Sequence, residues 1–148
     1  MTKILFICHG NICRSPMAEF VFKDMVKKAG KEAEFYINSA ATSTEEIGNP
    51  IYPDTRRILQ KYNIECTGHR AVRMTSDDYN RYDLLIVMDS NNLRNTLRIV
   101  GHDNKNKIKK LMDYTGGGDV ADPWYTGDFE TTYRDILSGC QALLDSLK

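Results

Sequence analysis

The chain has 148 residues, 41% of them hydrophobic, and this length predicts a single domain over 1–148 that can bury its own core. Its 20 basic and 20 acidic side chains cancel, so neither nucleic acid nor an anionic membrane is an expected partner. Four cysteines are too few for a secreted disulfide scaffold, and the apolar N-terminal run is too short for a signal peptide or a membrane span, so we expect a cytoplasmic protein.

The first predicted strand covers residues 3–8, an apolar run that ends in a cysteine. A helix follows, with Ser15 expected as its cap, Pro16 in its first turn and Gly30 at its end. The second predicted strand covers about 34–39. This alternation of strand and helix is typical of a layered α/β fold.

The middle and the end of the chain continue the alternation. A second helix is expected to begin at Pro53 and a short one near Thr75. Residues 83–88, DLLIVM, are almost continuously apolar, which predicts a central parallel strand covered on both faces. The remaining predicted elements are a helix over 90–100, a weaker edge strand over 107–112 and a final helix over 129–147.

Two of these helices are expected to pack through an apolar stripe at helical spacing. In the helix over 90–100 the stripe consists of Leu93, Leu97 and Val100. In the final helix it consists of Phe129, Tyr133, Ile136, Leu137, Cys140, Leu143, Leu144 and Leu147. Both stripes predict burial against the sheet or against a neighbouring helix.

Four strands with helices between them predict right-handed crossovers and a doubly wound parallel sheet with about five helices. In such sheets a ligand binds beyond the carboxyl ends of the strands. Cys8 stands at such an end, because it closes the first strand. We therefore expect the functional residues to gather at this edge of the sheet.

Cys8 is followed by five residues and then by Arg14 and Ser15, at the point where the first strand gives way to a helix. The positive end of a helix dipole favours a thiolate over a thiol, and the thiolate is the nucleophile. Backbone N–H groups at the same place suit a phosphate oxyanion, and a guanidinium can hold two of its oxygens. One loop is therefore expected to supply both a nucleophile and a cradle for phosphate.

Asp122 is the candidate for a catalytic acid. Phosphate monoesters hydrolyse so slowly that a nucleophile needs help from protonation of the leaving group. Pro123 restricts Asp122 to an extended backbone and so fixes the direction of its carboxyl group. Trp124 and Tyr125 follow directly and are expected to form a wall of a cleft for a flat substrate ring.

Residues 8–16, CHGNICRSP, resemble the signature of the low-molecular-weight protein tyrosine phosphatases. Further similar segments, in the order of that family, are 39–43, 47–50, 69–71, 88–89, 122–123 and 128–131. The resemblance implies a flavodoxin-like fold with four parallel strands. It also implies hydrolysis of phosphotyrosine proteins or peptides without metal or cofactor, binding of phosphate and vanadate, and a mainly monomeric enzyme.

The resemblance also implies a role for each residue of the site. Cys8 would attack phosphorus and form a phosphocysteine, while Arg14 would bind the phosphoryl group. Asp122 would protonate the tyrosyl oxygen and then deprotonate the water that releases phosphate. The other residues expected to contact the substrate are His9, Gly10, Asn11, Ile12, Cys13, Ser15, Glu45, Trp124 and Tyr125.

Behind the substrate, the resemblance implies a supporting shell. Ser15 would hydrogen-bond the Cys8 sulfur and stabilise it both as nucleophile and as leaving group. Asn11 would shape the loop, with support from Ser39 and His69.

Three positions bear on specificity. Glu45 lies where many members of the family have an aromatic residue, and an acidic side chain there would repel acidic substrates. Trp124 stands where tyrosine is more usual, which keeps an aromatic wall but loses a hydroxyl. Ile12 favours phosphotyrosine, because the phosphoarginine phosphatases of this family tend to have threonine at that position. Hydrolysis of phosphoarginine is kept as an alternative function.

The cysteines bear on a second alternative, an arsenate reductase-like thiol oxidoreductase, which can share this fold and loop. Such enzymes generally need further cysteines close together downstream, whereas only Cys66 and Cys140 remain here, far apart. Under the phosphatase resemblance, Cys13 would instead be the disulfide partner of Cys8 under peroxide, a reversible off-switch. A redox-regulated phosphatase is thus the leading interpretation.

A third alternative is a phosphoprotein-binding module without activity, which would lack the nucleophile, the arginine or the acid. All three are present. Asp89 and Asn92 are expected to cap the helix over 90–100 rather than to act in catalysis.

Overall fold

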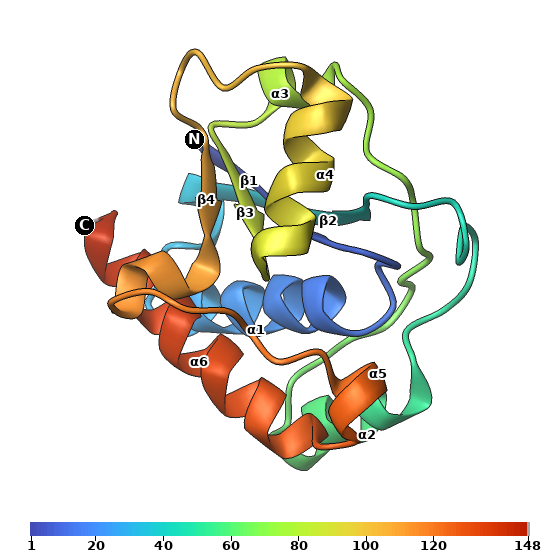
Figure 1. Ribbon diagram of the computed structural model, residues 1–148. Helices are drawn as coiled ribbons and strands as arrows, with labels where there is room; N and C mark the ends of the chain where they lie inside the picture. The colour runs from blue at the N-terminus through green and yellow to red at the C-terminus, as the bar shows by residue number, and fades with distance from the viewer. Residues whose placement is uncertain (148) are drawn as a thin grey trace.

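The computed structural model describes residues 1–147 and contains a sheet of four parallel strands in the order β2-β1-β3-β4 (Figure 1). The strands are β1 (Thr2–Cys8), β2 (Phe35–Ala41), β3 (Leu84–Val87) and β4 (Ile108–Lys110). Cys8 pairs with Ala41 at the end of β1 and β2, so these two strands finish side by side. The predicted doubly wound parallel sheet is confirmed.

Six α-helices lie among residues 1–147, against about five expected. They are α1 (Arg14–Lys28), α2 (Pro53–Lys61), α3 (Asp78–Arg81), α4 (Ser90–Val100), α5 (Pro123–Thr126) and α6 (Phe129–Ser146). Two 3-10 helices, η1 (Glu32–Glu34) and η2 (Leu111–Thr115), complete the set. None of the helices in this described part of the chain is both long and apolar enough to cross a membrane.

The two central strands send alternate side chains into two separate cores. Phe6 and Ile86 belong to the core that α1 and α6 cover, whereas Leu5 and Leu85 belong to the core on the α4 side. In Figure 1, α1 and α6 lie below the strands, whereas α4 lies in front of them. Burial on both faces explains why β3 and residues 4–8 of β1 are continuously apolar.

Some predicted element ends are wrong by one to three residues, for local reasons. Ser15 does not cap α1, because Cys13 is the N-cap residue and the Ser15 hydroxyl turns back toward the Cys8 sulfur. The strand expected over 107–112 ends at Lys110, because Leu111 begins η2.

The apolar stripes were only partly correct as predictors of burial. In α4 the fully buried residues are polar, Asn92 and Thr96, whereas Leu97 is 37% exposed. The Asn92 side chain accepts a hydrogen bond from the backbone N–H of Met88 at 3.2 Å, which anchors the start of α4 to the end of β3. In α6, Leu137 is likewise exposed while Ile136 and Cys140 are buried.

Candidate active site

The signature loop runs from the end of β1 to the first turn of α1, at the carboxyl edge of the sheet. Cys8 is the last residue of β1, and Arg14 is the first residue of α1. The loop thus brings the sulfur to the N-terminus of a helix of 15 residues, where free N–H groups and the helix dipole favour negative charge.

The Cys8 sulfur is surrounded by hydrogen-bond donors. The backbone N–H groups of Asn11 and Ser15 donate to Sγ at 3.3 and 3.4 Å, and the Ser15 hydroxyl lies 3.0 Å away. The residue is 3% exposed. Hydrogen bonds to an ionised group favour its charged form, so these contacts suit a thiolate.

Asn11 holds the loop in shape through its backbone and its side chain. Its backbone adopts a left-handed φ of 59°, which few residues other than glycine tolerate. Its Oδ1 accepts from the Val72 N–H at 3.1 Å, and its Nδ2 donates to Ser15 at 2.8 Å and to Ser39 at 2.9 Å. Its carbonyl oxygen accepts from Nε2 of His69 at 2.7 Å. A strained conformation persists only where its surroundings fix it in this way.

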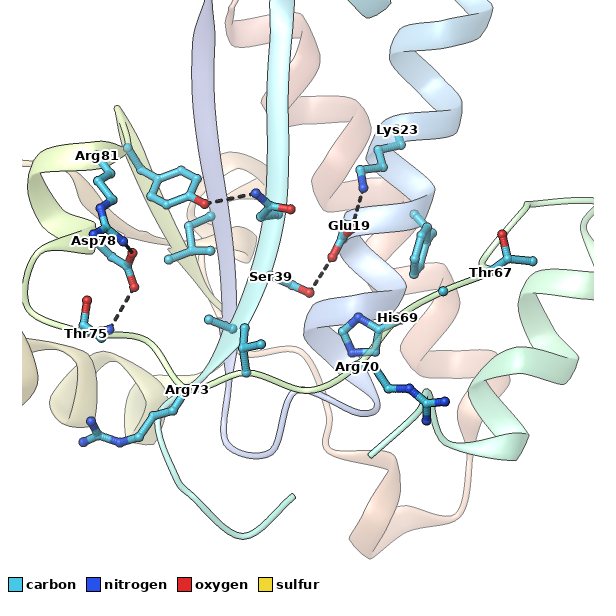
Figure 2. A pocket seen from close by; sticks show the side chains of 17 residues that line it. Glu19, Lys23, Ser39, Thr67, His69, Arg70, Arg73, Thr75, Asp78 and Arg81 are labelled. Atoms are coloured by element: carbon cyan, nitrogen blue, oxygen red, sulfur yellow. Dashed lines mark hydrogen bonds and ion pairs between the residues drawn. The ribbon is translucent and has the colours of Figure 1, made fainter. Parts of the chain in front are cut away.

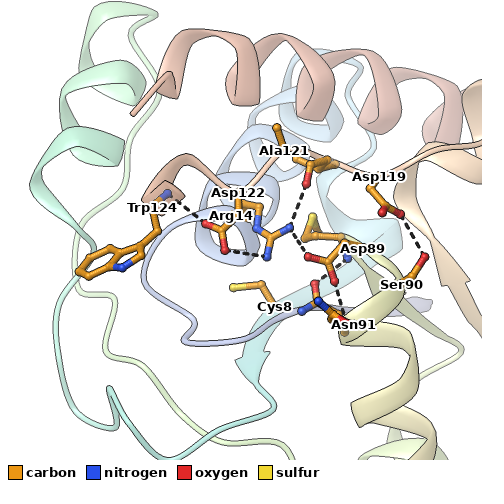
Figure 3. A network of polar contacts seen from close by, with 12 residues as sticks. Cys8, Arg14, Asp89, Ser90, Asn91, Asp119, Ala121, Asp122 and Trp124 are labelled. Atoms are coloured by element: carbon orange, nitrogen blue, oxygen red, sulfur yellow. Dashed lines mark hydrogen bonds and ion pairs between the residues drawn. The ribbon is translucent and has the colours of Figure 1, made fainter. Parts of the chain in front are cut away.

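Arg14 is buried and bound on three sides (Figure 3). Its Nη1 donates to Oδ2 of Asp89 at 2.8 Å and to the Val120 carbonyl at 2.9 Å, and its Nη2 lies 3.4 Å from Oδ2 of Asp122. Burial lowers the pKa of Arg14, but the negative charges of Cys8, Asp122 and Asp89 outweigh burial and raise it above the usual value. The guanidinium is therefore a permanent cation beside the sulfur.

Asp122 is the N-cap residue of α5, a single helical turn between the predicted edge strand and the predicted final helix. Its Oδ1 accepts from the backbone N–H of Trp124 at 3.1 Å, while its Oδ2 faces Arg14. Asp122 has the extended backbone that a following proline imposes, and Pro123 begins α5. This backbone agrees with the predicted fixed direction of the carboxyl group. The acid candidate thus lies beside the guanidinium of Arg14.

A cavity of about 340 Å³ opens above the sulfur. Most of the residues expected at the substrate line it, namely Cys8, His9, Gly10, Ile12, Cys13, Arg14, Glu45, Asp122, Trp124 and Tyr125. Asn11 and Ser15, which were also expected at the substrate, belong to the loop but are buried and do not line the cavity, and Ser39 and His69 lie behind the loop. Trp124 and Tyr125 are 59% and 85% exposed, so they form an open wall rather than a closed slot.

Two glutamates, Glu45 and Glu46, also line this cavity. Glu45 Oε2 lies 3.0 Å from Nε2 of His9, and both side chains are more than half exposed. Glu46 also lines the cavity, and its Cγ lies 3.4 Å from where a Cβ on Gly10 would sit. Glu46 therefore packs over the signature loop, which the sequence did not indicate.

Asp89 is the main residue that the sequence analysis missed. It caps α4 as expected, because its Oδ1 accepts from the Asn92 N–H at 2.7 Å, but its Oδ2 also holds Arg14. The position of Asp89 in the sequence could have revealed its contact with Arg14. It follows β3, which pairs with β1, so its side chain emerges at the same edge as Cys8.

The other cysteines differ sharply in environment. Burial raises the pKa of Cys13 to about 12, with a further increase from the charge on Cys8, so Cys13 is a thiol at neutral pH. Cys140 is fully buried in α6, and burial raises its pKa as well. Neither Cys140 nor the half-buried Cys66 lines the cavity.

Comparisons with known proteins show which family this sequence and this fold resemble. A family model described as "Low molecular weight phosphotyrosine protein phosphatase" matches residues 3–148. The low molecular weight protein-tyrosine-phosphatase YfkJ of Bacillus subtilis is 39% identical over 151 residues, which cover 100% of this chain and 97% of that protein. The crystal structure of YfkJ superposes with a TM-score of 0.96 over 99% of this chain and 94% of its own.

Two more distant structures indicate what this fold can hold. Wzb of Vibrio vulnificus, solved in complex with benzylphosphonate, is 25% identical with a TM-score of 0.87 and covers 98% of both chains. The drosophila arginine phosphatase DARP is 27% identical with a TM-score of 0.90, over 99% of this chain and 98% of its own. The fold alone therefore does not separate tyrosine from arginine phosphatases.

Proposed function

The chain belongs to the low molecular weight phosphotyrosine protein phosphatase family and is a protein tyrosine phosphatase, a hydrolase; we propose that it acts through a phosphocysteine on Cys8, with Asp122 as acid and base. One observation carries the proposal. The Cys8 sulfur lies at the base of the cavity within 3.0 to 3.4 Å of three hydrogen-bond donors, at a helix N-terminus. This is where an ionised sulfur and a phosphoryl group can meet.

Binding of the substrate uses the same loop. The backbone N–H groups of residues 9–14 and the Arg14 guanidinium hold the equatorial oxygens of the phosphoryl group. In the free enzyme two carboxylates share Arg14, at 2.8 and 3.4 Å, and the longer contact, with Asp122, is the one that a phosphoryl group displaces. Inorganic phosphate and vanadate bind in the same place as small oxyanions.

Transfer to the enzyme forms a bond between the Cys8 sulfur and phosphorus while the bond from phosphorus to the tyrosyl oxygen breaks. Asp122 gives its proton to that oxygen, so the leaving group departs as a neutral phenol. This step requires that Asp122 carries its proton when the substrate is bound. The exposed position of α5 leaves room for a tyrosyl ring against Trp124.

Hydrolysis of the phosphocysteine runs the proton transfer in reverse. Asp122, now a carboxylate, takes a proton from water as the water oxygen attacks phosphorus. The sulfur–phosphorus bond breaks, and the electron pair returns to Cys8 as a thiolate that the Ser15 hydroxyl stabilises from 3.0 Å. Inorganic phosphate leaves and the enzyme is regenerated.

Phosphotyrosine is the proposed substrate rather than phosphoarginine. Ile12 lines the cavity and offers no hydroxyl to a guanidinium, and the walls supplied by Trp124 and Tyr125 suit an aromatic ring. Against a thiol oxidoreductase, Cys140 is fully buried and Cys66 lies outside the cavity, so neither is placed to relay a disulfide. The acid at Asp122 also has a task only in hydrolysis.

Three further proposals accompany this mechanism. Cys13, next to Cys8 in the cavity wall, forms a reversible disulfide with it under peroxide. The chain acts as one domain over 1–148 and mainly as a monomer. Its few cysteines, all four of them free, support a reducing cytoplasmic location.

Turnover of para-nitrophenyl phosphate in the presence of EDTA tests the proposal directly. We expect wild-type turnover to persist with chelator and Cys8→Ser to abolish it while keeping the fold. Cys66→Ser is the matched control, because it removes a thiol outside the cavity and leaves turnover unchanged. Full activity in the Cys8 variant would refute the phosphocysteine route.

A further inference from the structure

The hydrogen bonds behind the signature loop continue from Ser39 in β2 to Glu19 and Lys23 in α1. The Ser39 hydroxyl donates to Oε1 of Glu19 at 2.5 Å, and Lys23 Nζ donates to Oε2 of the same carboxylate at 2.5 Å (Figure 2). The Glu19 side chain is 7% exposed, and that of Lys23 is 43% exposed. Together with Ser39 and His69 they line a second cavity of about 510 Å³, which shares no lining residue with the active-site cavity.

The donor and the acceptor of each hydrogen bond in this network can be assigned. The Val72 backbone N–H can only donate, so Oδ1 of Asn11 is its acceptor and Nδ2 of Asn11 supplies two hydrogens, to Ser15 and Ser39. The Ser15 hydroxyl accepts one of them, which leaves its own hydrogen for the Cys8 sulfur at 3.0 Å. Ser15 is therefore the donor to the sulfur.

The Ser39 hydroxyl is constrained in the same way. It accepts from Asn11, so its own hydrogen needs another acceptor, and Glu19 is the one it has. Ser39 is 5% exposed, and a buried hydroxyl without an acceptor is costly. A buried carboxylate without a cation is costly too, and Lys23 supplies that cation from the solvent side.

We propose that Glu19, held by Lys23, is a positioning residue for catalysis. By fixing the Ser39 hydroxyl, it anchors Asn11 in its left-handed conformation, and Asn11 in turn places the Ser15 hydroxyl and its own N–H on the Cys8 sulfur. This role rests on the proposed function, because it serves a sulfur that reacts as a thiolate. Helix α1 then has two tasks: its first turn supplies the positive end of the dipole, and Glu19 fixes the residues behind the loop.

Four variants separate positioning from charge. Glu19→Ala removes the acceptor for Ser39, and Lys23→Met leaves a buried carboxylate unpaired. In the double variant Glu19→Gln with Lys23→Met, the amide oxygen still accepts from Ser39 without any buried charge. Lys28→Met is the control, because it breaks the ion pair with Asp24 on the surface of the same helix, at 2.8 Å.

Two measurements on folded protein are informative. The first is the midpoint, on the pH scale, of Cys8 alkylation by iodoacetamide, and the second is kcat for para-nitrophenyl phosphate. The charged and titratable groups around the sulfur, Arg14, Asp89, Asp122 and Cys13, are the same in every variant, as is His69 behind the loop. Thermal unfolding of each variant reports any purely structural cost.

We expect Glu19→Ala to move the alkylation midpoint to higher pH and to lower kcat about tenfold, the effect of one weakened hydrogen bond to a charged group. Lys23→Met moves both in the same direction, the double variant recovers most of the loss, and Lys28→Met matches wild type. A lower unfolding temperature with an unchanged midpoint and kcat would overturn the proposal.

If Glu19→Ala does not fold, Lys23→Met and the double variant decide the question, because Lys23 lies at the surface and glutamine keeps the shape of Glu19. A double variant as impaired as Lys23→Met would contradict the proposed anchoring of Ser39. Failure of the proposed function looks different. In that case Cys8→Ser keeps its turnover, whatever the Glu19 variants do.

Discussion

Nη1 of Arg14 lies 2.8 Å from Oδ2 of Asp89, in a largely buried ion pair that joins the first turn of α1 to the N-cap of α4. The second oxygen of Asp89 accepts from the Asn92 N–H at 2.7 Å, so one carboxylate both caps a helix and holds the arginine. The two strands that precede these residues, β1 and β3, are neighbours in the sheet. The pair therefore orients the guanidinium before any substrate arrives.

Asp89→Asn tests this relationship. Asparagine caps a helix as well as aspartate, so the substitution removes the charge on the Arg14 partner and keeps the cap. We expect kcat/KM for para-nitrophenyl phosphate to fall about tenfold, which corresponds to about 1.4 kcal/mol. Asp24→Asn, which breaks a surface pair on α1, is the control and retains wild-type kinetics. Equal kinetics in both variants would show that Asp89 serves only as a cap.

Asp122→Asn tests the acid. The amide still caps α5 but cannot give a proton to the leaving group, so a poor leaving group suffers most. We expect turnover of phenyl phosphate to fall about 100-fold or more and turnover of para-nitrophenyl phosphate to fall clearly less. The ratio of kcat values for the two esters is the measurement. An unchanged ratio would reject Asp122 as the acid.

Glu45→Tyr tests the acidic side chain in the cavity. The exposed Glu45 carboxylate repels acidic residues next to a phosphotyrosine, and exposed charge pairs are worth about two- to fivefold. Wild type should favour phosphotyrosine peptides with lysine neighbours over those with glutamate neighbours. The tyrosine variant should lose this preference, while Glu65→Tyr, outside the cavity, should keep it. Identical kcat/KM for both peptides with wild type would refute the repulsion.

Peroxide treatment tests the role of Cys13. Oxidised Cys8 closes a disulfide only when Cys13 loses its proton, and burial raises the pKa of Cys13, so that step becomes faster as pH rises above 7. Wild type should recover activity after reduction, whereas Cys13→Ser should be inactivated permanently as Cys8 oxidises further. Recovery is measured by para-nitrophenyl phosphate turnover after dithiothreitol. Full recovery of the Cys13 variant would show that another device protects Cys8.

The parts of the fold that the sequence predicted are those with a local signal. DLLIVM at 83–88 indicates a strand buried on both faces, and β3 is that strand. The Cys8 loop is predictable because its chemistry lies within eight consecutive residues. The helix from Ser90 to Val100 was predicted with correct bounds, because Asp89 and Gly101 are strong end signals.

The residues that the sequence did not indicate act through tertiary contacts. Asp89 looks like an ordinary helix cap and Glu19 like an ordinary helix residue until the fold places Arg14 and Ser39 beside them. Buried Thr96 and exposed Leu97 reverse the apolar pattern of α4, which no periodicity reveals. Pairings across 20 to 75 residues of sequence have no signature in a single chain.

Alkylation of Cys8 by iodoacetamide across pH, with and without vanadate or inorganic phosphate, is the most direct test of the account. A sulfur with three hydrogen-bond donors at a helix N-terminus should react as a thiolate at pH values well below those at which a free cysteine ionises, and either oxyanion should protect it. An alkylation curve like that of a free thiol, with no protection by vanadate or phosphate, would contradict the account.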